Sequence, residues 1–533
     1  VRDLGAWFKR ELENLQAEFP TVIAEVRGQG LLIGLVLAEP PATLLAETLM
    51  TAAASQGLMT GLVSAYLLNC EGVRVAPALN KSNVIRLEPP LTVTREECLF
   101  ALGALRKVMR VLQQSDAGAL LSGVIDGAAI DAEYFPAPVA GAASEQVDLC
   151  VLVHPTSSSD YAAFDLSLAR LPGLTIDEIA TRMGGFLDPF VASRFSVTSP
   201  FATVNGCLIT LPYTAEQMLS GERSEVLAHL REAAQIGVSL GAKLIGLGAF
   251  TSIATRGGLD LKGCGAALTT GNAYTAVTAF EQVTEACAVR GVELGGCNVA
   301  IVGAAGSVGG ATAMLLALKA ARLIFIGAPN ERPEHVERRL KRAAAGLCKE
   351  IVAHVAAGGA IDVDSLAAEI AADQRLTARP GDASVFHEIV EDLVHRKGRL
   401  IVGCSIEHLL PLADIVVLAT SSPEQLVKPA FLRRDAIVCD VSRPRNASAA
   451  ISALRPDVLL VEAGTVETPG RMQIGNLGLP AGETFACIAE TIVLALDGDY
   501  RDRTLDSPLD LPQLLSIQSR ATAHRFRVRL PRQ

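Results

Sequence analysis

The run Val299-Ala-Ile-Val-Gly303-Ala-Ala-Gly306-Ser-Val-Gly309 decides the fold of the second half of this chain. It follows an apolar strand-like segment and leads into an apolar helical segment, Gly310–Leu318. Glycines at such a junction allow a tight turn and let a pyrophosphate approach the helix N-terminus. The run therefore predicts a dinucleotide-binding loop, with a plain strand-to-helix turn as the alternative; the expected cofactor contacts are Gly303, Ala305, Gly306, Ser307, Val308 and Gly309.

Apolar runs of strand length alternate with helical patterns around this loop. They lie at Asn298–Gly303, Arg322–Gly327, Leu400–Gly403, Asp414–Thr420, Ala436–Val441 and Val458–Ala463. The pattern predicts an α/β fold with a Rossmann-type, doubly wound parallel sheet over about residues 295–500. A long charged segment, about 335–397, has a helical pattern and reads as an insertion.

The second strand of this sheet ends at Gly327, where NAD-specific folds usually carry an acidic residue for the ribose hydroxyls. NADP is therefore favoured, and Arg332 is the nearest cation for its 2′-phosphate, unless it is an ordinary solvated arginine. Polar or small residues at later strand ends are expected near the nicotinamide, although loop geometry alone could explain them; they are Thr420, Ser421, Asp440 and Gly464.

The rest of the chain divides by pattern into four further parts. Residues 1–112 begin with an amphipathic helix and form a small α/β unit, and 113–146 are rich in Ala, Gly, Ser and Pro, which indicates a linker. An apolar strand, Val147–Val153, starts a second α/β domain at 147–294. Residues 501–533 are expected to pack back as a C-terminal extension.

Composition limits the classes of partner. A net charge of −10 disfavours general nucleic-acid binding, and no apolar run reaches the roughly 18 residues of a membrane span. The 11 cysteines lack close CxxC pairs, so we expect no metal site and no disulfide framework. With no recognisable signal peptide, the chain reads as a cytoplasmic protein that acts on small molecules or carried substrates.

One cysteine stands at a predicted helix start, in Ala481-Gly-Glu-Thr-Phe-Ala-Cys487-Ile-Ala-Glu490. If Thr484 is the N-cap, Cys487 lies in the first turn, where the helix dipole favours its thiolate. Such a thiolate could attack a thioester. A buried structural cysteine is the alternative.

Residues from about 147 to 530 resemble the long-chain acyl-carrier-protein reductases. The resemblance lies in separated blocks, which include Leu247-Gly-Ala-Phe-Thr-Ser-Ile253, Thr269-Thr-Gly-Asn272, Phe485-Ala-Cys-Ile-Ala-Glu490 and His524-Arg-Phe526. It implies that Cys487 is acylated by an acyl carrier protein or acyl-CoA, and that hydride from NADPH then releases an aldehyde. The long helical insertion and the stretch Ala328-Pro-Asn-Glu-Arg332 depart from the family pattern.

This chemistry requires groups that stabilise an oxyanion and supply a proton. Thr270 and Asn272 are candidate oxyanion donors, although a Thr-Gly-Asn run is often only a turn. His154 follows a predicted strand whose end should face the cleft, so it is the candidate proton source, with a structural histidine as the alternative.

Residues 21–112 resemble the C-terminal small domain of class III, pyridoxal-phosphate-dependent aminotransferases. The blocks are Val26-Arg-Gly28-Gln-Gly30-Leu-Leu-Ile-Gly34 and Ile85-Arg86-Leu-Glu-Pro89-Pro90-Leu91. The domain that carries the cofactor lysine is not among these residues, so we expect no pyridoxal phosphate on this chain. The order implies an aminotransferase–reductase fusion that makes an amine, and the aminotransferase part is the expected site of homodimer contact.

Two other classes of protein remain open. A dehydrogenase of the shikimate or glutamyl-tRNA-reductase type also joins a catalytic α/β domain to a Rossmann domain, and Asp440-Val-Ser-Arg-Pro-Arg-Asn446 resembles the latter. The other class is a non-catalytic module that binds NADP or docks a carrier protein. Substitution of Cys487 by serine separates the dehydrogenase from the covalent reductase, whereas binding of NADPH without turnover of any thioester would favour the docking module.

Overall fold

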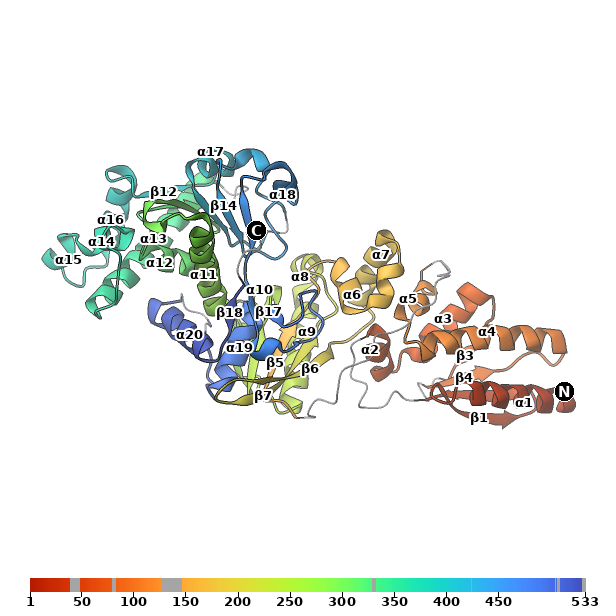
Figure 1. The fold of residues 1–533 in the computed structure, drawn as a ribbon. Coiled ribbons are helices and arrows are strands. Elements are labelled where there is room, and N and C mark those ends of the chain that lie inside the picture. Colours follow the sequence, from red (N-terminus) through yellow and green to blue (C-terminus); the bar gives the residue numbers. More distant parts are fainter. Residues whose placement is uncertain are drawn as a thin grey trace.

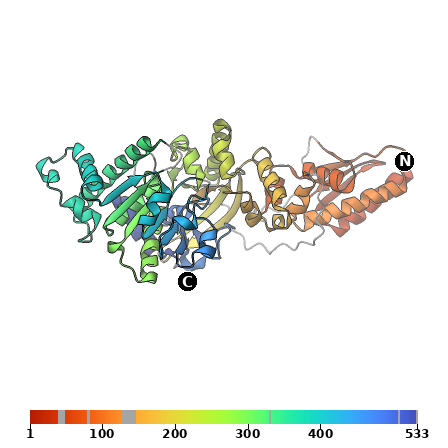
Figure 2. The same ribbon diagram turned by 90° about the horizontal axis from the view of Figure 1, so that it is seen from above.

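The computed structural model describes residues 1–38, 48–78, 83–125, 146–327, 332–422, 424–503, 505 and 509–529. The molecule is elongated, with the N-terminus at one end and the helices of residues 333–395 at the other (Figures 1 and 2). Within the described residues the strands form four sheets, and helices cover them. The fold is α/β, as the sequence predicted.

The N-terminal unit is an antiparallel sheet in the order β1-β2-β4-β3. The amphipathic pattern at the start of the chain forms helix α1 (Arg2–Glu18), which buries Phe8, Leu12 and Leu15. The other elements of this unit are β1 (Ile23–Gln29), β2 (Leu32–Leu37), α2 (Leu49–Ser55), α3 (Met59–Glu71), β3 (Ala76–Pro77), β4 (Val84–Leu87) and α4 (Arg95–Gln113).

The stretch predicted as a linker, 113–146, departs from that prediction in its first part. Helix α5 (Ala117–Ser122) lies there, and all six of its residues are buried. Asp116 caps this helix through the Ala119 N–H at 2.9 Å, and Arg170 pairs with the same carboxylate. Small residues allow the close approach, because a Cβ on Gly118 would lie 2.4 Å from the Ser167 carbonyl oxygen. Residues 126–145 lie outside the described part.

Segments on both sides of the expected linker share one core. Residues of the N-terminal helices and of α6 (Ser159–Phe164), η1 (Leu166–Arg170) and α7 (Gly173–Met183) form a single apolar cluster. The Leu49 N–H donates to the Asp165 carboxylate at 2.9 Å across this contact. The N-terminal unit therefore packs directly on the start of the second α/β unit.

The second sheet has the order β6-β7-β5-β8-β9 and is parallel except for the antiparallel β6–β7 pair. Strand β5 alternates between two cores: Cys150 and Leu152 pack with α9, while Leu149 and Val151 join the cluster that contains α11 and α19. The elements are β5 (Leu149–Val153), β6 (Phe190–Thr198), β7 (Thr203–Thr210), α8 (Ala215–Ser220), α9 (Arg223–Ser239), β8 (Leu244–Leu247), α10 (Phe250–Ala254), η2 (Leu259–Leu261), β9 (Ala267–Thr269) and α11 (Asn272–Arg290).

The third sheet is the predicted Rossmann sheet. Its six strands are all parallel in the order β12-β11-β10-β13-β14-β15, which is the doubly wound 3-2-1-4-5-6 arrangement. All six predicted strands are present: β10 (Asn298–Val302), β11 (Arg322–Ile326), β12 (Leu400–Gly403), β13 (Ile415–Leu418), β14 (Ile437–Asp440) and β15 (Leu459–Glu462). The strand order reverses beside β10, where such folds bind their ligands.

Helices occupy the connections of this sheet, and the charged segment predicted as an insertion is helical. The insertion between β11 and β12 buries apolar residues of its longest helix, including Val336, Leu340 and Leu347. The helices and 3₁₀ turns are η3 (Leu294–Gly296), α12 (Ser307–Ala317), α13 (Pro333–Ala356), α14 (Leu366–Ala371), α15 (Arg375–Ala378), α16 (Ser384–His395), α17 (Ile406–Leu409), η4 (Leu410–Leu412), η5 (Pro429–Phe431) and α18 (Ala450–Leu454).

The C-terminal segments return to the second α/β unit. A three-stranded antiparallel sheet, β17-β16-β18, leads into α19, which lies against β5, β7 and β8. His524 fastens the end of the chain, because its ring nitrogens lie 2.9 Å from Ser199 Oγ and 2.9 Å from an Asp497 oxygen. These elements are β16 (Thr465–Glu467), η6 (Pro469–Arg471), β17 (Glu483–Phe485), α19 (Ala486–Leu496), α20 (Leu511–Ala523) and β18 (Arg527–Val528).

Candidate active site

Cys487 is the second residue of α19 and is partly exposed. The predicted N-cap is wrong: Phe485 holds the cap position without a side-chain bond, and Thr484 lies in β17 with a buried hydroxyl that has no partner in the described part of the chain. Pairing of Thr484 with Val466 keeps the backbone extended, so the helix begins only after the strand. Cys487 still lies in the first helical turn.

The thiol is enclosed by backbone from two loops. A Cβ on Gly271, whose φ is +70°, would lie 2.4 Å from Cys487 Cβ, so only glycine allows this approach. The backbone N–H groups of Ala249 and Ile488 are among the groups that lower the pKa of the Cys487 thiol. Burial nevertheless raises the pKa of the Cys487 thiol, and the N–H donors only partly oppose that shift. The helix position alone therefore does not make Cys487 a thiolate.

Thr270 and Asn272 flank the glycine that touches the cysteine. Thr270 is buried. Asn272 is the first residue of α11, and its Nδ2 donates to Ser307 Oγ at 3.3 Å. Ser307 is the first residue of α12, in the glycine loop. One turn therefore connects the cysteine to the expected dinucleotide loop.

Glu490 stabilises the turn at residues 270–272 through hydrogen bonds to the residues on either side of it. The sequence analysis did not assign this role to it. It is buried in α19, one helical turn after Cys487. Its carboxylate accepts from Thr269 Oγ1 at 2.6 Å and from the Tyr274 N–H at 2.7 Å. Burial raises the pKa of Glu490, and these hydrogen bonds oppose the shift. The sequence signal that could have indicated this contact is an acidic residue inside an otherwise apolar helix.

The glycine loop follows β10 and ends at the N-terminus of α12, with Gly306 as the cap residue. Gly303 has a φ of +91°, and a Cβ there would lie 2.3 Å from the Ala419 carbonyl oxygen. A Cβ on Gly309 would lie 2.3 Å from the Gly303 carbonyl oxygen. The loop is thus a tight turn whose exposed surface at Gly306 and Ser307 is backbone or a small side chain. Ala305 and Val308 are half-buried against the core.

Three of the strand-end residues lie at the carboxyl edge of the same sheet, and two of them, Thr420 and Asp440, bond to the loop that follows β14. Thr420 Oγ1 donates to Asn446 Oδ1 at 2.5 Å, and the Thr420 N–H donates to Ser442 Oγ at 3.1 Å. Asp440 is buried and accepts from the N–H groups of Ser442 and Ala447 at 2.9 and 2.8 Å. Asp440 therefore organises the loop after β14. Ser421 beside Thr420 is exposed.

Gly464 joins the two α/β units. Its φ is +81°, its N–H donates to Gln282 Oε1 at 3.0 Å, and its carbonyl accepts from the Ala486 N–H at 2.9 Å. Gly464 thereby fixes the start of α19, the helix that carries Cys487, against the Rossmann sheet.

Gly327 and Arg332, the two residues used to predict cofactor preference, lie on either side of the start of the helical insertion. A Cβ on Gly327 would lie 2.3 Å from Val336 Cγ1, so close packing of α13 requires glycine there whichever cofactor binds. Arg332 is exposed at the cap of α13, after residues outside the described part.

His154, the predicted proton source, directly follows β5 and is buried. Its Nε2 accepts from the Phe250 N–H at 3.0 Å, and its Nδ1 donates to the Pro155 carbonyl oxygen at 2.7 Å. Burial lowers the pKa of His154 to about 4, so the ring is neutral at physiological pH. Both ring nitrogens are therefore engaged in hydrogen bonds within the protein.

Arg443 is a further site residue that the sequence reasoning did not single out. It lies in the Asp440–Asn446 motif, and its guanidinium carbon is 5.6 Å from the centre of the Phe485 ring. Two guanidinium nitrogens donate to the carbonyl oxygens of Ser442 and Ala463, at 2.8 and 3.1 Å. Burial and the neighbouring Arg445 lower the pKa of Arg443, while the nearby Cys487 thiol is among the groups that oppose this shift. A cation from the Rossmann unit therefore lies beside Phe485, two residues before Cys487.

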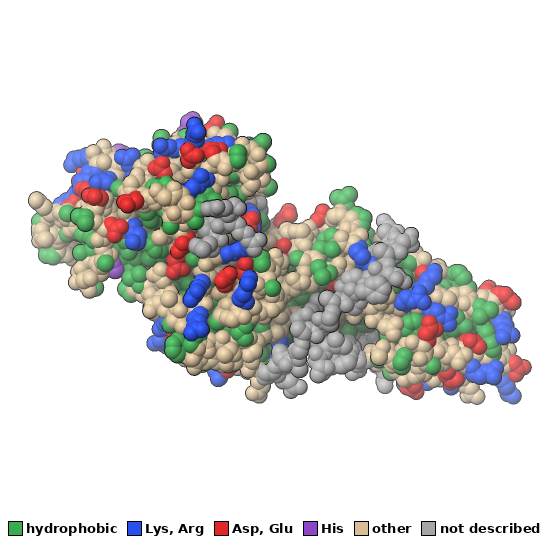
Figure 3. Space-filling view, in the orientation of Figure 1, with side chains coloured by type: hydrophobic (Ala, Val, Ile, Leu, Met, Phe, Trp, Pro, Cys, Tyr) green, Lys and Arg blue, Asp and Glu red, His purple; other side chains and the backbone are tan. Residues whose placement is uncertain are grey.

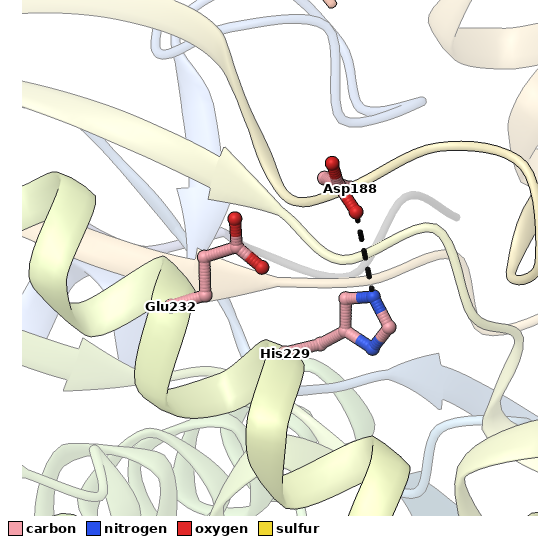
Figure 4. Close-up of side chains that lie close together, drawn as sticks. All are labelled: Asp188, His229 and Glu232. Carbon is pink, nitrogen blue, oxygen red and sulfur yellow. Dashed lines mark ion pairs between the residues drawn. The ribbon is translucent and has the colours of Figure 1, made fainter.

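A second polar group lies away from this site, where Asp188, His229 and Glu232 approach one another (Figure 4). His229 Nε2 is 3.8 Å from an Asp188 oxygen, and the Tyr213 hydroxyl lies 2.8 Å from His229 Nδ1. Both carboxylates are exposed. This arrangement has the character of a surface ion pair.

The surface and the helices bear on possible partners. On the face in Figure 3, acidic and basic side chains are intermixed over both halves of the molecule. Among the helices of the described residues, none combines the length and the apolar character that a bilayer crossing requires.

No family model matches the chain. It is similar to the aminotransferase PigE of Serratia sp., with 25% identity over 349 residues that make up 64% of this chain and 34% of that protein. An acetylornithine aminotransferase of Thermosynechococcus vestitus is 38% identical over 109 residues, 20% of this chain and 22% of the enzyme. The chain thus spans about a third or less of these aminotransferases.

A second similarity is to a long-chain acyl-[acyl-carrier-protein] reductase of Synechococcus elongatus. Identity is 23% over 333 residues, which cover 58% of this chain and 78% of the reductase. Among solved structures, an NAD-dependent malic enzyme from Thermotoga maritima is 12% identical, covering 81% of this chain and 94% of the enzyme at a TM-score of 0.29. That score is too low to support an inference. The chain therefore combines weak similarity to a reductase with similarity to aminotransferases.

Proposed function

We propose that this chain is an oxidoreductase that uses NADPH to reduce a fatty acyl thioester to an aldehyde through an acyl group on Cys487. The observation that carries the proposal is the turn at Gly271 and Asn272. It touches the cysteine on one side and hydrogen-bonds to Ser307 of the glycine loop on the other. A nucleophile and a dinucleotide loop on one turn suit a reaction in which the acyl group meets a hydride donor.

The first step uses groups of this chain. The Cys487 thiol loses its proton to solvent, its sulfur forms a bond to the acyl carbon as the bond from that carbon to the carrier sulfur breaks, and the carrier thiolate takes up a proton from solvent. Arg443 and the Ala249 N–H favour the anionic sulfur. Backbone N–H groups at the start of α19, with Thr270 and Asn272 beside them, are the candidate donors to the oxyanion.

The residues of the glycine loop fit a dinucleotide. A Cβ added to Gly303 or Gly309 would lie 2.3 Å from a backbone carbonyl oxygen, so only glycine allows this tight turn, and the exposed Gly306 caps the helix. Gly303–Gly309 would hold the pyrophosphate, and Thr420, Ser421 and the 440–446 loop would border the nicotinamide. Arg332 is the candidate for the 2′-phosphate. NADPH held there would supply the hydride to the acyl carbon, and the Cys487 sulfur would be the leaving group as the aldehyde is released.

The division of labour that we propose follows the sheets. The unit at 147–294 binds the acyl chain, the unit at 295–500 binds NADPH, and residues 1–112 belong to a fused aminotransferase that converts the aldehyde to an amine. The similarity to both a reductase and aminotransferases supports this division. The carrier is an acyl carrier protein or coenzyme A.

Intact-protein mass spectrometry tests the proposal. Wild type, Cys487→Ser and the control Cys404→Ser are exposed to an acyl thioester without cofactor, and NADPH is then added. Cys404 is another half-buried cysteine, so its variant measures non-specific acylation. We expect an acyl adduct on wild type and the control only, and its discharge as aldehyde by NADPH. Adducts on all three proteins, or none, would reject the covalent reductase.

A second candidate function is a dehydrogenase for a small anionic substrate. Arg443 favours it, since a half-buried cation beside the site suits a carboxylate as well as a thiolate. This candidate predicts turnover that survives in Cys487→Ser. Binding of NADPH without turnover of any thioester or small acid would instead favour a docking module.

A further inference from the structure

The loops that follow β13 and β14 are joined at the carboxyl edge of the Rossmann sheet. The two strands are parallel neighbours, so both loops leave the sheet at the same edge. The Val427 N–H donates to the Asn446 carbonyl oxygen at 3.0 Å, and the Ser448 N–H donates to the Val427 carbonyl oxygen at 2.9 Å. Backbone hydrogen bonds therefore connect the two loops beyond the ends of their strands.

The side chain of Asn446 adds to this connection. It is fully buried and comes from the loop after β14. Its Oδ1 accepts from Thr420 Oγ1 at 2.5 Å, and its Nδ2 donates to the carbonyl oxygens of Ser422 and Glu424, each at 2.9 Å. The amide oxygen and both amide protons are thus used on the loop after β13. A buried amide whose bonds are all made stabilises one conformation of the loop that it contacts.

The turn that Asn446 contacts lies against the glycine loop. A Cβ on Gly303 would lie 2.3 Å from the Ala419 carbonyl oxygen and 3.1 Å from Thr420 Cγ2. Ser421 stands between two residues that bond to Asn446, and it is exposed. The position of this exposed serine relative to the glycine loop therefore depends on the hydrogen bonds of Asn446.

The loops after β13 and β14 also lie toward the helix that carries Cys487. Arg443, in the loop after β14, has its guanidinium carbon 5.6 Å from the centre of the Phe485 ring, two residues before Cys487. In the sheet, β13 and β14 lie on one side of β10 and β11 lies on the other. A dinucleotide bound where the strand order reverses has its two halves on opposite sides of this point. The half nearer the cysteine is the half beside the loops that Asn446 joins.

We propose that Asn446 is a positioning residue for the nicotinamide half of the cofactor, because it holds Thr420–Ser422 in the conformation that borders the nicotinamide. This inference rests on the proposed function, in which NADPH binds at the glycine loop. The adenosine half would bind on the β11 side, toward Arg332, away from the two joined loops. Asn446 therefore acts on the binding of one half of the cofactor and not on that of the other.

Two ligands separate the halves of the cofactor. NADPH contains both, whereas adenosine 2′,5′-bisphosphate contains the adenosine and the 2′-phosphate without the nicotinamide. Isothermal titration calorimetry measures the affinity of each ligand for wild type and for Asn446→Leu, whose side chain has a similar size and makes no hydrogen bonds. We expect Asn446→Leu to bind NADPH about tenfold more weakly, because the bonds to the turn are lost, and to bind the bisphosphate within about twofold of wild type.

Asn476→Leu is the matched control. Asn476 is exposed and lies outside the Rossmann sheet, and its Nδ2 also donates to two backbone carbonyl oxygens, those of Ala163 and Phe164. Its replacement should leave both affinities unchanged. If Asn446→Leu fails to fold, Asn446→Asp takes its place, since the carboxylate keeps an acceptor for Thr420 but lacks the two N–H donors. The same selective loss of NADPH affinity is expected.

Equal losses of both affinities in a variant with normal thermal unfolding, or no loss of either, would overturn the proposal. Binding does not depend on turnover. A selective loss of NADPH affinity in a protein that forms no aldehyde would therefore support the role of Asn446 and reject the reductase. A wild-type protein that does not bind NADPH would reject both.

Discussion

The glycine loop and the cysteine site differ in how they are built, although one hydrogen bond connects them. The loop is a continuous run, Gly303–Gly309, and its shape follows from three glycines that admit close backbone contacts. The cysteine site gathers single residues from β5, the loops after β8, β9 and β14, and the start of α19. A contiguous motif can be read from a sequence, whereas an assembled site depends on every element that delivers a residue.

The largest expected effect separates the chemistry from cofactor binding. Cys487→Ser should lower kcat/KM for an acyl thioester roughly a thousandfold or more, because the hydroxyl lacks the thiolate's nucleophilicity. NADPH affinity, measured by fluorescence titration, should stay within about twofold, since no residue of the loop changes. Equal losses in both measurements would mean that the two regions are one structural unit.

Gly271→Ala should break the contact between the regions. The new Cβ would lie 2.4 Å from that of Cys487, and a displaced nucleophile can cost about a hundredfold in turnover. Gly263→Ala is the matched control, because its φ of +83° carries similar backbone strain with no atom within 4 Å. Equal activity losses in the two variants would attribute the effect to backbone strain alone.

Gly303→Ala should act on the other region. The Cβ would meet the Ala419 carbonyl oxygen at 2.3 Å, and we expect roughly tenfold weaker NADPH binding. Acylation of Cys487 without cofactor should be nearly normal. Gly358→Ala, at a φ of +80° with nothing within 4 Å, controls for strain. Normal NADPH binding by Gly303→Ala would indicate that the loop is only a turn.

The smallest expected effect is on the free energy of unfolding and concerns Glu490, which accepts hydrogen bonds from Thr269 and Tyr274. Burial raises the pKa of this carboxyl above its ordinary 4.5, so the folded protein favours the protonated form. Stability from that preference is present at low pH and is lost as the pH rises through the raised pKa. Glu490→Gln cannot ionise, so its unfolding free energy relative to wild type should improve by about 1–2 kcal/mol across this window.

Urea unfolding of wild type and Glu490→Gln at several pH values checks the sign. The exposed Glu407→Gln, in α17, is the control and should show no such trend. A relative stability of Glu490→Gln that falls as the pH rises would mean that the carboxylate gains more from Thr269 and Tyr274 than burial costs it.

Features that depend on a continuous run of residues were predicted from the sequence more accurately than features that depend on contacts between distant segments. All six Rossmann strands were predicted, because parallel strands buried on both faces read as apolar β-branched runs. The helix start at Cys487 was predicted one residue too early, since pairing of β17 with β16 competes with capping by Thr484. The linker prediction omitted α5, whose small residues give little periodicity but fit closely against Ser167.

The sequence by itself determined the Rossmann-type sheet strands, the glycine loop and the position of Cys487 near a helix start. Each of these features is set by residues that lie within a short stretch of the chain. Only the tertiary structure decided what surrounds the cysteine. His154, directly after β5, accepts from the Phe250 N–H, Arg443 lies beside the Phe485 ring, and Glu490 accepts from the Tyr274 N–H in the turn that carries Asn272. These contacts join residues that lie far apart along the chain, and burial then sets the charge that each of them can carry.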